Sequence, residues 1–305
     1  MKRRPRPRRL DGVLLVDKPQ GWTSHDVVAR VRQLTGERRV GHTGTLDPHA
    51  TGLLLLALGR GTKLASFMTS LEKTYEGEIA LGIRTTTDDT EGEVLDTRPV
   101  PEIGDAELRA LEQRFSGSIE QVPPAFSAVK VGGKRSYALA RKGEPPELKP
   151  RTVQVRELHL WKVAPDRLGI RVTCSAGTYV RALARDIGDA LGCGGHLAHL
   201  TRTRIGRFHL SQAVTMDELE EAAREGRMEQ LVLPIDEGVA SYDAAIVTRG
   251  RAIRLAHGET VEPSFRPWLP SECARLYDAA GTFIGMGRVL LSGHIRPVRI
   301  VADLD

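Results

Sequence analysis

The chain has 305 residues, 40% of them hydrophobic and 27% charged, with three well-separated cysteines and a net charge of +5. This composition is ordinary for a soluble globular protein whose length suits two domains, and it excludes a disulfide framework, as expected in a reducing cytosol. The positive charge favours a polyanionic partner such as nucleic acid, although a basic protein without such a partner is an equal alternative.

The first segment, MKRRPRPRRL, is basic and interrupted by proline. No apolar stretch follows it, so we do not expect a secretory signal. Residues 1–10 then form an arm that either touches phosphate groups or is solvated. The longest apolar run, residues 53–58, is too short to cross a bilayer. We therefore expect a cytoplasmic protein without a membrane partner.

Hydrophobic periodicity predicts a mixed α/β (α+β) protein. Thr23 and Asp26 have the spacing of a capping box, which starts a helix that a glycine ends. The predicted strands lie at 13–16, 75–83, 152–163 and 168–175, and the predicted helices at 24–35, 105–115, 178–192 and 216–229. These elements form a first, larger domain at 11–240, interrupted by a basic, irregular insert at 123–150. Short β-type segments then indicate a second, β-rich domain at 241–305.

The most unusual segment is RVGHTGTLDPHATGLLLLALG, residues 39–59. Asp47 stands in a turn rich in glycine and threonine, where Pro48 disfavours helical dihedrals and the glycines leave room for a ligand. A carboxylate there can act as nucleophile, general base or metal ligand, but an Asp-Pro turn also forms for structural reasons alone. The histidine ahead of it and the apolar run behind it favour the functional alternative.

Three other polar clusters favour structural explanations. His42, Asp47 and His49 could ligate zinc, but the sequence offers no obvious further ligand. The letters SHD at 24–26 spell a catalytic triad only in sequence, because consecutive helical residues point to different sides. The acidic residues of 88–91 lack the ligand order of a calcium loop and predict a solvated turn.

Aromatic and basic residues elsewhere fit an RNA ligand. Tyr75 opens a predicted strand, where its ring can be part of the core or can stack on a base. Arg181 follows the start of a predicted helix and can be an ordinary surface residue or bridge a carboxylate and a phosphate. The insert interleaves basic residues, including Lys130 and Arg141, with aromatic residues such as Phe126, a pattern typical of nucleic-acid binding.

The segment GHTGTLDPHATG resembles the catalytic motif of the TruB family, the tRNA pseudouridine-55 synthases. The resemblance continues in order along nearly the whole chain, through KPQGWTS at 18–24, KTYEGEIALG at 73–82, VPPAFSAVKVGGKRSYALARKG at 122–143, GTYVRALARDIG at 177–188 and LTRTRIGRF at 200–208. The last part of the chain resembles a PUA domain. Several motifs in the same order make coincidence a poor explanation.

The resemblance implies the pseudouridine synthase fold, a long, mostly antiparallel mixed sheet flanked by helices, followed by a small PUA-like β-barrel. It implies that the protein converts uridine 55 in the T-loop of tRNA into pseudouridine on a flipped-out base. The N1–C1′ bond breaks and a C5–C1′ bond forms. Because nothing is consumed, no cofactor or metal is implied, and the sequence shows no convincing phosphate loop or metal cluster.

The resemblance also assigns roles to single residues. Asp47 matches the catalytic aspartate, Tyr75 the tyrosine that stacks on the uracil, and Arg181 the arginine that pairs with the aspartate. Tyr179 matches a tyrosine of the active site, and His42 matches the histidine that fills the stack after the base has left.

Four further residues are expected to support substrate binding. Leu200 matches a leucine that lines the pocket, and Lys18 a lysine that supports the N-terminal motif. Lys130 and Arg141 belong to the insert that resembles the family's RNA-binding thumb. Phe126 and Thr201 depart from the family pattern, which commonly has tyrosine and arginine there, and these departures concern RNA affinity more than chemistry.

Two other functions share these features. Guide-RNA-dependent relatives have the same catalytic motifs, but they need partner proteins and lack an insert like 123–150. An RNA-binding or tRNA-folding module would use the basic insert without needing Asp47, Tyr75 and Arg181 together. We expect a stand-alone enzyme, without an obligatory protein partner, that is a monomer.

Overall fold

The structure, a computed structural model, describes residues 10–304 apart from residues 128, 145 and 263–270. Almost all of the predicted basic arm, residues 1–9, therefore lies outside the described residues. Within the described part, none of the helices combines the length and the apolar character that a membrane span requires.

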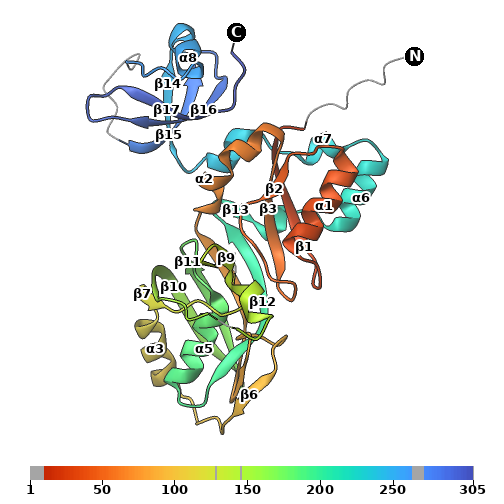
Figure 1. Ribbon diagram of the computed structural model, residues 1–305, viewed down its shortest axis with the longest axis vertical. Helices are drawn as coiled ribbons and strands as arrows, with labels where there is room; N and C mark the ends of the chain where they lie inside the picture. The colour runs from red at the N-terminus through yellow and green to blue at the C-terminus, as the bar shows by residue number, and fades with distance from the viewer. Residues whose placement is uncertain (1–9, 128, 145, 263–270, 305) are drawn as a thin grey trace.

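A long sheet forms the centre of the first 240 residues (Figure 1). Among the described residues it has nine strands in the order β1-β3-β12-β4-β11-β10-β7, with β2 beside β3 and β13 beside β12. The strands are β1 (Gly12–Lys18), β2 (Val40–His42), β3 (Thr51–Leu58), β4 (Lys73–Leu81), β7 (Gly117–Gln121), β10 (Arg151–Ala164), β11 (Arg167–Cys174), β12 (Gly195–Ile205) and β13 (Phe208–His209). Among the described strands of this sheet, β3 and β12 are the only parallel pair. This confirms the mostly antiparallel mixed sheet.

Helices flank the sheet at both ends (Figure 1). One pair, α1 and α6, packs together beside β1 and β2, while α3 lies against β10 and α5 against β12. The α-helices are α1 (Ser24–Thr35), α2 (Ala65–Thr69), α3 (Asp105–Arg114), α4 (Ser136–Ala140), α5 (Val180–Ala190), α6 (Met216–Arg224), α7 (Met228–Leu231) and α8 (Arg249–Ala256), and the short 3-10 helices are η1 (Gly59–Leu64), η2 (Leu210–Gln212) and η3 (Ile235–Val239). The predicted capping box of α1 is confirmed by reciprocal hydrogen bonds between Thr23 and Asp26.

The first strand is apolar on both faces because both faces are covered. Leu14 and Val16 pack in a core with α1 and α6, whereas Val13 and Leu15 pack in a second core with Met68 of α2. The same alternation in β3 divides its leucines between these two cores. A strand buried on both faces reads as a continuous apolar run, which explains the leucines that follow the Asp47 motif.

Two hairpins outside the large sheet matter for the site. Strands β5 (Ile83–Thr85) and β6 (Val94–Thr97) form one hairpin, whose loop carries the acidic residues of 88–91. Strands β8 (Lys130–Val131) and β9 (Lys134–Arg135) form the other, and with α4 they give the predicted insert short regular elements.

Two predicted elements are interrupted by glycine. The predicted strand at 75–83 breaks at Gly82, whose φ is +82°, so that β4 ends before it and β5 begins after it. The predicted helix at 216–229 breaks near Gly226, which has a φ of +70° and separates α6 from α7. Both predictions were wrong in length because glycine adopts these left-handed angles readily and so permits a turn.

A separate sheet follows at the C-terminal end, which confirms a second β-rich unit. Its strands, β14 (Asp243–Val247), β15 (Ser271–Asp278), β16 (Phe283–Val289) and β17 (Ile295–Ile300), pair in this order. Arg60 donates a hydrogen bond of 3.2 Å to the carbonyl of Val301, and Lys63 one of 3.0 Å to that of Ile300. Met286 and Val301 also join the core beside β1 and β3. The PUA-like barrel and the domain boundaries stay predictions.

Candidate active site

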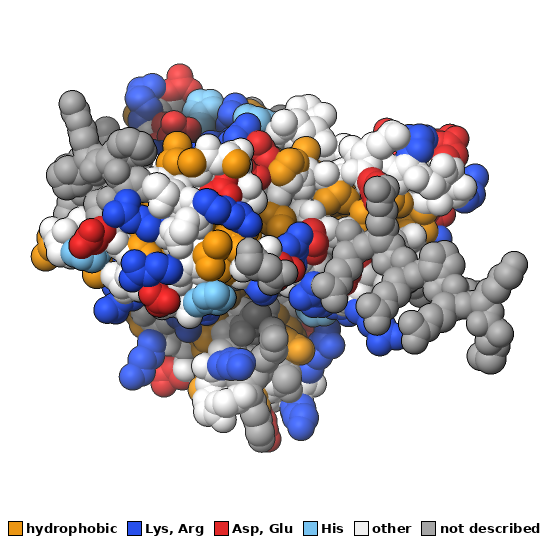
Figure 2. Space-filling model, turned by 90° about the horizontal axis from the view of Figure 1, so that it is seen from above, with side chains coloured by type: hydrophobic (Ala, Val, Ile, Leu, Met, Phe, Trp, Pro, Cys, Tyr) orange, Lys and Arg blue, Asp and Glu red, His pale blue; other side chains and the backbone are white. Residues whose placement is uncertain are grey.

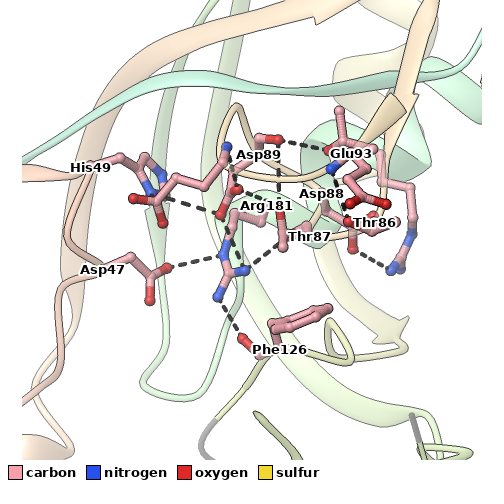
Figure 3. Close-up of polar contacts among 12 residues, drawn as sticks. Asp47, His49, Thr86, Thr87, Asp88, Asp89, Glu93, Phe126 and Arg181 are labelled. Carbon is pink, nitrogen blue, oxygen red and sulfur yellow. Dashed lines mark hydrogen bonds and ion pairs between the residues drawn. The ribbon is translucent and has the colours of Figure 1, made fainter. Parts of the chain in front are cut away.

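An ion pair joins Asp47, in the loop between β2 and β3, to Arg181 at the start of α5 (Figure 3). Arg181 Nε lies 2.9 Å from Asp47 Oδ2. The arginine side chain is only 7% exposed, whereas the aspartate side chain is 37% exposed. A ligand can therefore reach the carboxylate while its counter-ion stays fixed in the protein.

The amphipathic pattern of α5 directs Arg181 to this position. Val180, Leu183 and Ile187 pack in the core of the sheet, so the helix turns another face toward the β5–β6 loop. Arg181 and Arg185, one helical turn apart, both lie on that face. Arg185 pairs with Asp88 at 2.9 Å, and the two arginines together fix the loop against the helix.

The β5–β6 loop supplies a second carboxylate, which the sequence did not indicate. Asp89 is 2% exposed, and its Oδ2 lies 3.3 Å from Arg181 Nη1. The other oxygen of Asp89 accepts hydrogen bonds from the Thr87 hydroxyl and, at 3.0 Å, from the Glu91 backbone N–H. Burial raises the pKa of Asp88 despite its ion pair with Arg185. The prediction of a solvated acidic turn was wrong for Asp88 and Asp89, because both carboxylates pair with arginines, whereas Glu91 is half-exposed.

Two main-chain carbonyls also accept hydrogen bonds from Arg181. Nη1 donates to the Thr87 carbonyl at 2.9 Å, and Nη2 donates to the Phe126 carbonyl at 3.0 Å (Figure 3). Phe126 belongs to the insert, so the same guanidinium links the loop that carries Asp47, the β5–β6 loop and the insert. Removing one partner of such a buried charge is far more costly than breaking a surface pair.

Lys18 holds the turn that contains Asp47. Its side chain is fully buried, and Nζ donates to the carbonyls of Pro19 at 2.9 Å, Trp22 at 2.6 Å and Pro48 at 3.3 Å. Burial lowers the pKa of Lys18 to about 8, although the nearby charge of Asp47 works in the opposite direction. This geometry agrees with the supporting role expected for Lys18.

Other polar contacts fix the loop ahead of Asp47. The Ser24 hydroxyl at the start of α1 accepts from the Leu46 backbone N–H at 2.8 Å and donates to the Leu46 carbonyl at 3.1 Å. Thr43 donates to the Leu55 carbonyl through both its backbone N–H, at 3.0 Å, and its hydroxyl, at 3.2 Å. The KPQGWTS segment and β3 therefore position the loop that carries Asp47 from two sides.

Arg202 on β12 is a further contributor that the sequence analysis did not select. It is 1% exposed and donates to the carbonyls of Leu53 at 2.8 Å and Gly44 at 3.1 Å. Its guanidinium carbon also lies 6.0 Å from the centre of the Tyr75 ring. Gly52 faces the Arg202 backbone so closely that a Cβ would lie 2.5 Å from its carbonyl oxygen. The signal in the sequence was its place in LTRTRIGRF, one of the segments that carry the family resemblance.

Tyr75 and Leu200 belong to the apolar core beside the Asp47 loop. Both are nearly buried and share one core with Leu46, the residue before Asp47. Burial raises the pKa of the Tyr75 hydroxyl, and the negative charge of Asp47 adds to this effect. Tyr75 therefore stays neutral at physiological pH.

Tyr179 is half-buried and precedes α5. The Gln121 side chain accepts from its backbone N–H at 2.8 Å and donates to its carbonyl at 3.1 Å, which ties this helix start to β7. His42 ends β2 and packs edge-to-face against His25, with 5.2 Å between ring centres. Thr201, the departure beside Leu200, shares a hydrogen bond of 2.8 Å with the hydroxyl of Thr51.

The two basic residues selected in the insert lie at the surface. Lys130 and Arg141 are exposed, and the guanidinium of Arg141 lies 5.7 Å from the centre of the Tyr137 ring. Their proposed contacts with RNA stay predictions.

The zinc alternative required His42, Asp47 and His49 to bring their ligand atoms together, and the structure does not place these three atoms together. Within the described part of the chain, the residues that could share a cation are His49, Asp89 and Glu91.

Comparisons with known proteins show the family to which the chain belongs. Residues 32–180 match the family model "TruB family pseudouridylate synthase (N terminal domain)", residues 181–240 match "tRNA pseudouridylate synthase B C-terminal domain", and residues 244–301 match "Pseudouridine synthase II TruB, C-terminal". A tRNA pseudouridine synthase B from Thermobifida fusca is 46% identical over 96% of this chain and 99% of its own length. One from Burkholderia mallei is 44% identical over 97% of each chain. The protein belongs to the TruB family of pseudouridylate synthases.

Solved structures support the fold. A Cbf5-Nop10-Gar1 complex contains a chain that superposes with a TM-score of 0.74 at 22% identity, covering 97% of this chain and 84% of that one. An archaeal box H/ACA sRNP Nop10-Cbf5 complex gives the same TM-score and identity, covering 99% and 90%. At this identity the likeness concerns the fold alone, and it confirms the pseudouridine synthase fold.

Proposed function

We propose that this protein converts uridine 55 of tRNA into pseudouridine, with the ionised carboxylate of Asp47 as the catalytic group. The observation that carries the proposal is the Asp47–Arg181 pair, in which a buried arginine aims a solvent-accessible carboxylate from a glycine-rich loop. The family to which the chain belongs and the names of its relatives support the reaction and the tRNA substrate.

The reaction needs an ionised carboxylate close to C1′ and C6 of the nucleotide. Asp47 acts there as nucleophile or stabilises developing charge, and its ion pair with Arg181 keeps it oriented. After the new C5–C1′ bond has formed, C5 loses its proton, and N1, which has lost its bond to C1′, ends with a proton in its place, so the isomerisation conserves all atoms. Arg181 is itself held by Asp89 and by two carbonyls, which limits its movement during the reaction.

Tyr75 and Leu200 provide the surface against which the detached uracil turns. The Tyr75 ring stacks on the base, and its hydroxyl is neutral because burial raises its pKa. Leu200 excludes water from one side of the same pocket. Tyr179, which Gln121 fixes at the start of α5, completes the wall next to Arg181.

Access to uridine 55 requires extrusion of the base from the T-loop, which costs a few kcal/mol. His42, at the end of β2, fills the vacated stack and offsets part of that cost. Lys and Arg side chains are spread over the face in Figure 2, with Asp and Glu between them. Charge alone therefore does not mark the RNA path. We assign the RNA backbone contacts to Lys130 and Arg141 because the insert also contacts Arg181 through Phe126.

Replacement of Asp47 by asparagine tests this proposal. The variant Asp47→Asn keeps the size and turn-forming capacity of the residue but removes its charge. It should bind unmodified tRNA like the wild type and form no pseudouridine. Asp96→Asn, which removes a surface carboxylate paired with Arg98, is the control and should remain active. Full turnover by Asp47→Asn would exclude Asp47 from the chemistry.

The same assay separates the alternatives. A stand-alone enzyme modifies tRNA without added proteins or guide RNA. A guide-dependent enzyme forms pseudouridine only when its guide RNA and partner proteins are added. A pure RNA-binding module forms no pseudouridine under either condition. We propose that the protein acts alone, as a monomer, in the cytoplasm. Sedimentation with and without tRNA tests the monomer, since a second protein copy in the complex would contradict it.

A further inference from the structure

A histidine and two carboxylates meet beside the Asp47–Arg181 pair. His49 follows Asp47 by two residues, while Asp89 and Glu91 lie in the β5–β6 loop. His49 Nδ1 is 3.7 Å from Asp89 Oδ2 and 3.8 Å from Glu91 Oε2, and the three potential ligand atoms all lie within 4.8 Å of one another. Segments about 40 residues apart thus converge on one point, with His49 facing Asp89 in Figure 3.

His49 lacks the hydrogen bonds that its burial demands. Its exposed fraction is 7%, and neither ring nitrogen has a hydrogen-bond partner among the residues that the structure describes. Separations of 3.7 and 3.8 Å are too long for hydrogen bonds to the carboxylates. A buried polar group without a partner is costly, and such groups are rare in folded proteins. The ring is therefore aimed at two oxygens that it does not bind directly.

A small cation between these atoms would satisfy all three. Nitrogen and oxygen ligands lie about 2.0–2.2 Å from Zn²⁺, so two ligands of one ion can be up to about 4 Å apart. The observed separations of 3.7 and 3.8 Å fall within this limit. Glu91 is half-exposed, which leaves its carboxylate free to adjust and the site open to solvent.

We propose that His49, Asp89 and Glu91 bind a divalent transition-metal cation of the Zn²⁺ type next to the active site. One imidazole and two carboxylates suit Zn²⁺ and similar ions, whereas Mg²⁺ and Ca²⁺ prefer oxygen ligands alone. The sequence suggested two other metal sites, a zinc site that included His49 and a calcium loop at residues 88–91. The proposed site differs from both, because it joins His49 of the first to Asp89 and Glu91 of the second.

Cation binding at this site opposes the chemistry. Asp89 Oδ2 is the oxygen that faces both His49 Nδ1 and Arg181 Nη1. A cation on that oxygen competes with the guanidinium and repels it. Since Arg181 also orients Asp47, the bound cation inhibits pseudouridine formation. This second step rests on the proposed function, whereas the binding site does not.

The binding test uses the full-length protein, freed of metal with EDTA and then titrated with Zn²⁺ against a chromophoric chelator. His49→Leu should abolish one binding event or weaken it at least about 100-fold, since loss of a ligand exceeds the 10- to 100-fold effect of losing a supporting contact. His159→Leu is the matched control, because His159 lies 3.1 Å from Glu112 in an exposed pair outside this cluster. Equal Zn²⁺ stoichiometry and affinity for wild type and His49→Leu would overturn the site.

Two further measurements complete the test. Thermal melting in EDTA shows whether His49→Leu folds, and if it does not, Glu91→Gln takes its place and should weaken Zn²⁺ binding at least tenfold. In the tRNA assay, saturating Zn²⁺ should slow the wild type at least tenfold, reversibly with EDTA, and should spare His49→Leu. Zn²⁺ that binds without slowing the wild type would overturn the inhibition. If the wild type does not modify tRNA, the proposed function fails, while the Zn²⁺ titration still decides whether the binding site exists.

Discussion

Arg181 and Asp89 form a buried ion pair, with 3.3 Å between Nη1 and Oδ2 and with both side chains less than 10% exposed. Arg181 pairs with Asp47 on its other side. The guanidinium is thus shared by an interior carboxylate, Asp89, which anchors it, and a more accessible one, Asp47, which we propose meets the substrate. Asp89 lies in the β5–β6 loop, which a second ion pair, between Arg185 and Asp88, also holds against α5.

Removal of the anchoring charge should slow the chemistry without preventing RNA binding. Asp89→Asn keeps an oxygen for the turn but removes the charge that holds Arg181. A charge-assisted hydrogen bond contributes about 1.5–3 kcal/mol, so we expect single-turnover rates about 10- to 100-fold below wild type. Asp186→Asn is the control, because Asp186 pairs with Arg185 rather than Arg181. A wild-type rate for Asp89→Asn would show that Asp47 alone positions the arginine.

Local patterns in the sequence predicted much of the fold and part of the site. The helix after Thr23 and the strand pair β10–β11 are confirmed, because capping and alternation are encoded within a few residues. Asp47 and Arg181 were selected from their motifs, and the structure brings them to 2.9 Å. The predicted roles of these residues await the experiments above.

Contacts across long sequence separations escaped the sequence analysis. Asp89 sits in a run of Thr, Asp and Gly that looks like a solvated turn, and only the packing of that loop against α5 and His49 buries it. Arg202 stands in a strand, and its carbonyl partners Leu53 and Gly44 are about 150 residues away. No local pattern identifies such partners, because the tertiary fold determines which charges become buried.

The exposed arginine of the insert should contribute to RNA affinity rather than to catalysis. Arg141→Ala removes one positive charge and its stacking contact with Tyr137. We expect the KM for tRNA to rise about three- to tenfold with kcat unchanged, and the slope of log affinity against log salt to fall by about one. Arg109→Ala removes an exposed arginine from α3, outside the insert, as a control. Equal effects of the two substitutions would mean that only net charge matters.

Two glycines with left-handed backbone angles should differ in their tolerance of alanine. Gly36 has φ +70°, and no atom of the described residues lies within 4 Å of the position that a Cβ would take, so Gly36→Ala should cost only about 1–2 kcal/mol of unfolding free energy. Gly52 has φ +100°, and a Cβ there would lie 2.5 Å from the Arg202 carbonyl oxygen. Gly52→Ala should therefore lose at least about 3 kcal/mol in urea unfolding, and equal losses would contradict the close β3–β12 contact.

The buried Lys18 should make stability depend on pH in the alkaline range. An unfolded lysine keeps its proton up to about pH 10.4, whereas burial lowers the pKa of folded Lys18 to about 8. Between these values the unfolded state binds more protons, so the free energy of unfolding gains a contribution that rises with pH. Below pH 8 both states hold the proton, and this contribution stays constant.

Comparison with Lys18→Met isolates that contribution. The difference in unfolding free energy, wild type minus variant, should grow by up to about 3 kcal/mol between pH 8 and pH 10.5. Lys73, whose pKa burial also lowers to about 8, is present in both proteins and cancels. Urea unfolding at several pH values provides the measurement. Parallel stability profiles would show that folded Lys18 titrates like an unfolded lysine, in conflict with its full burial against three carbonyls.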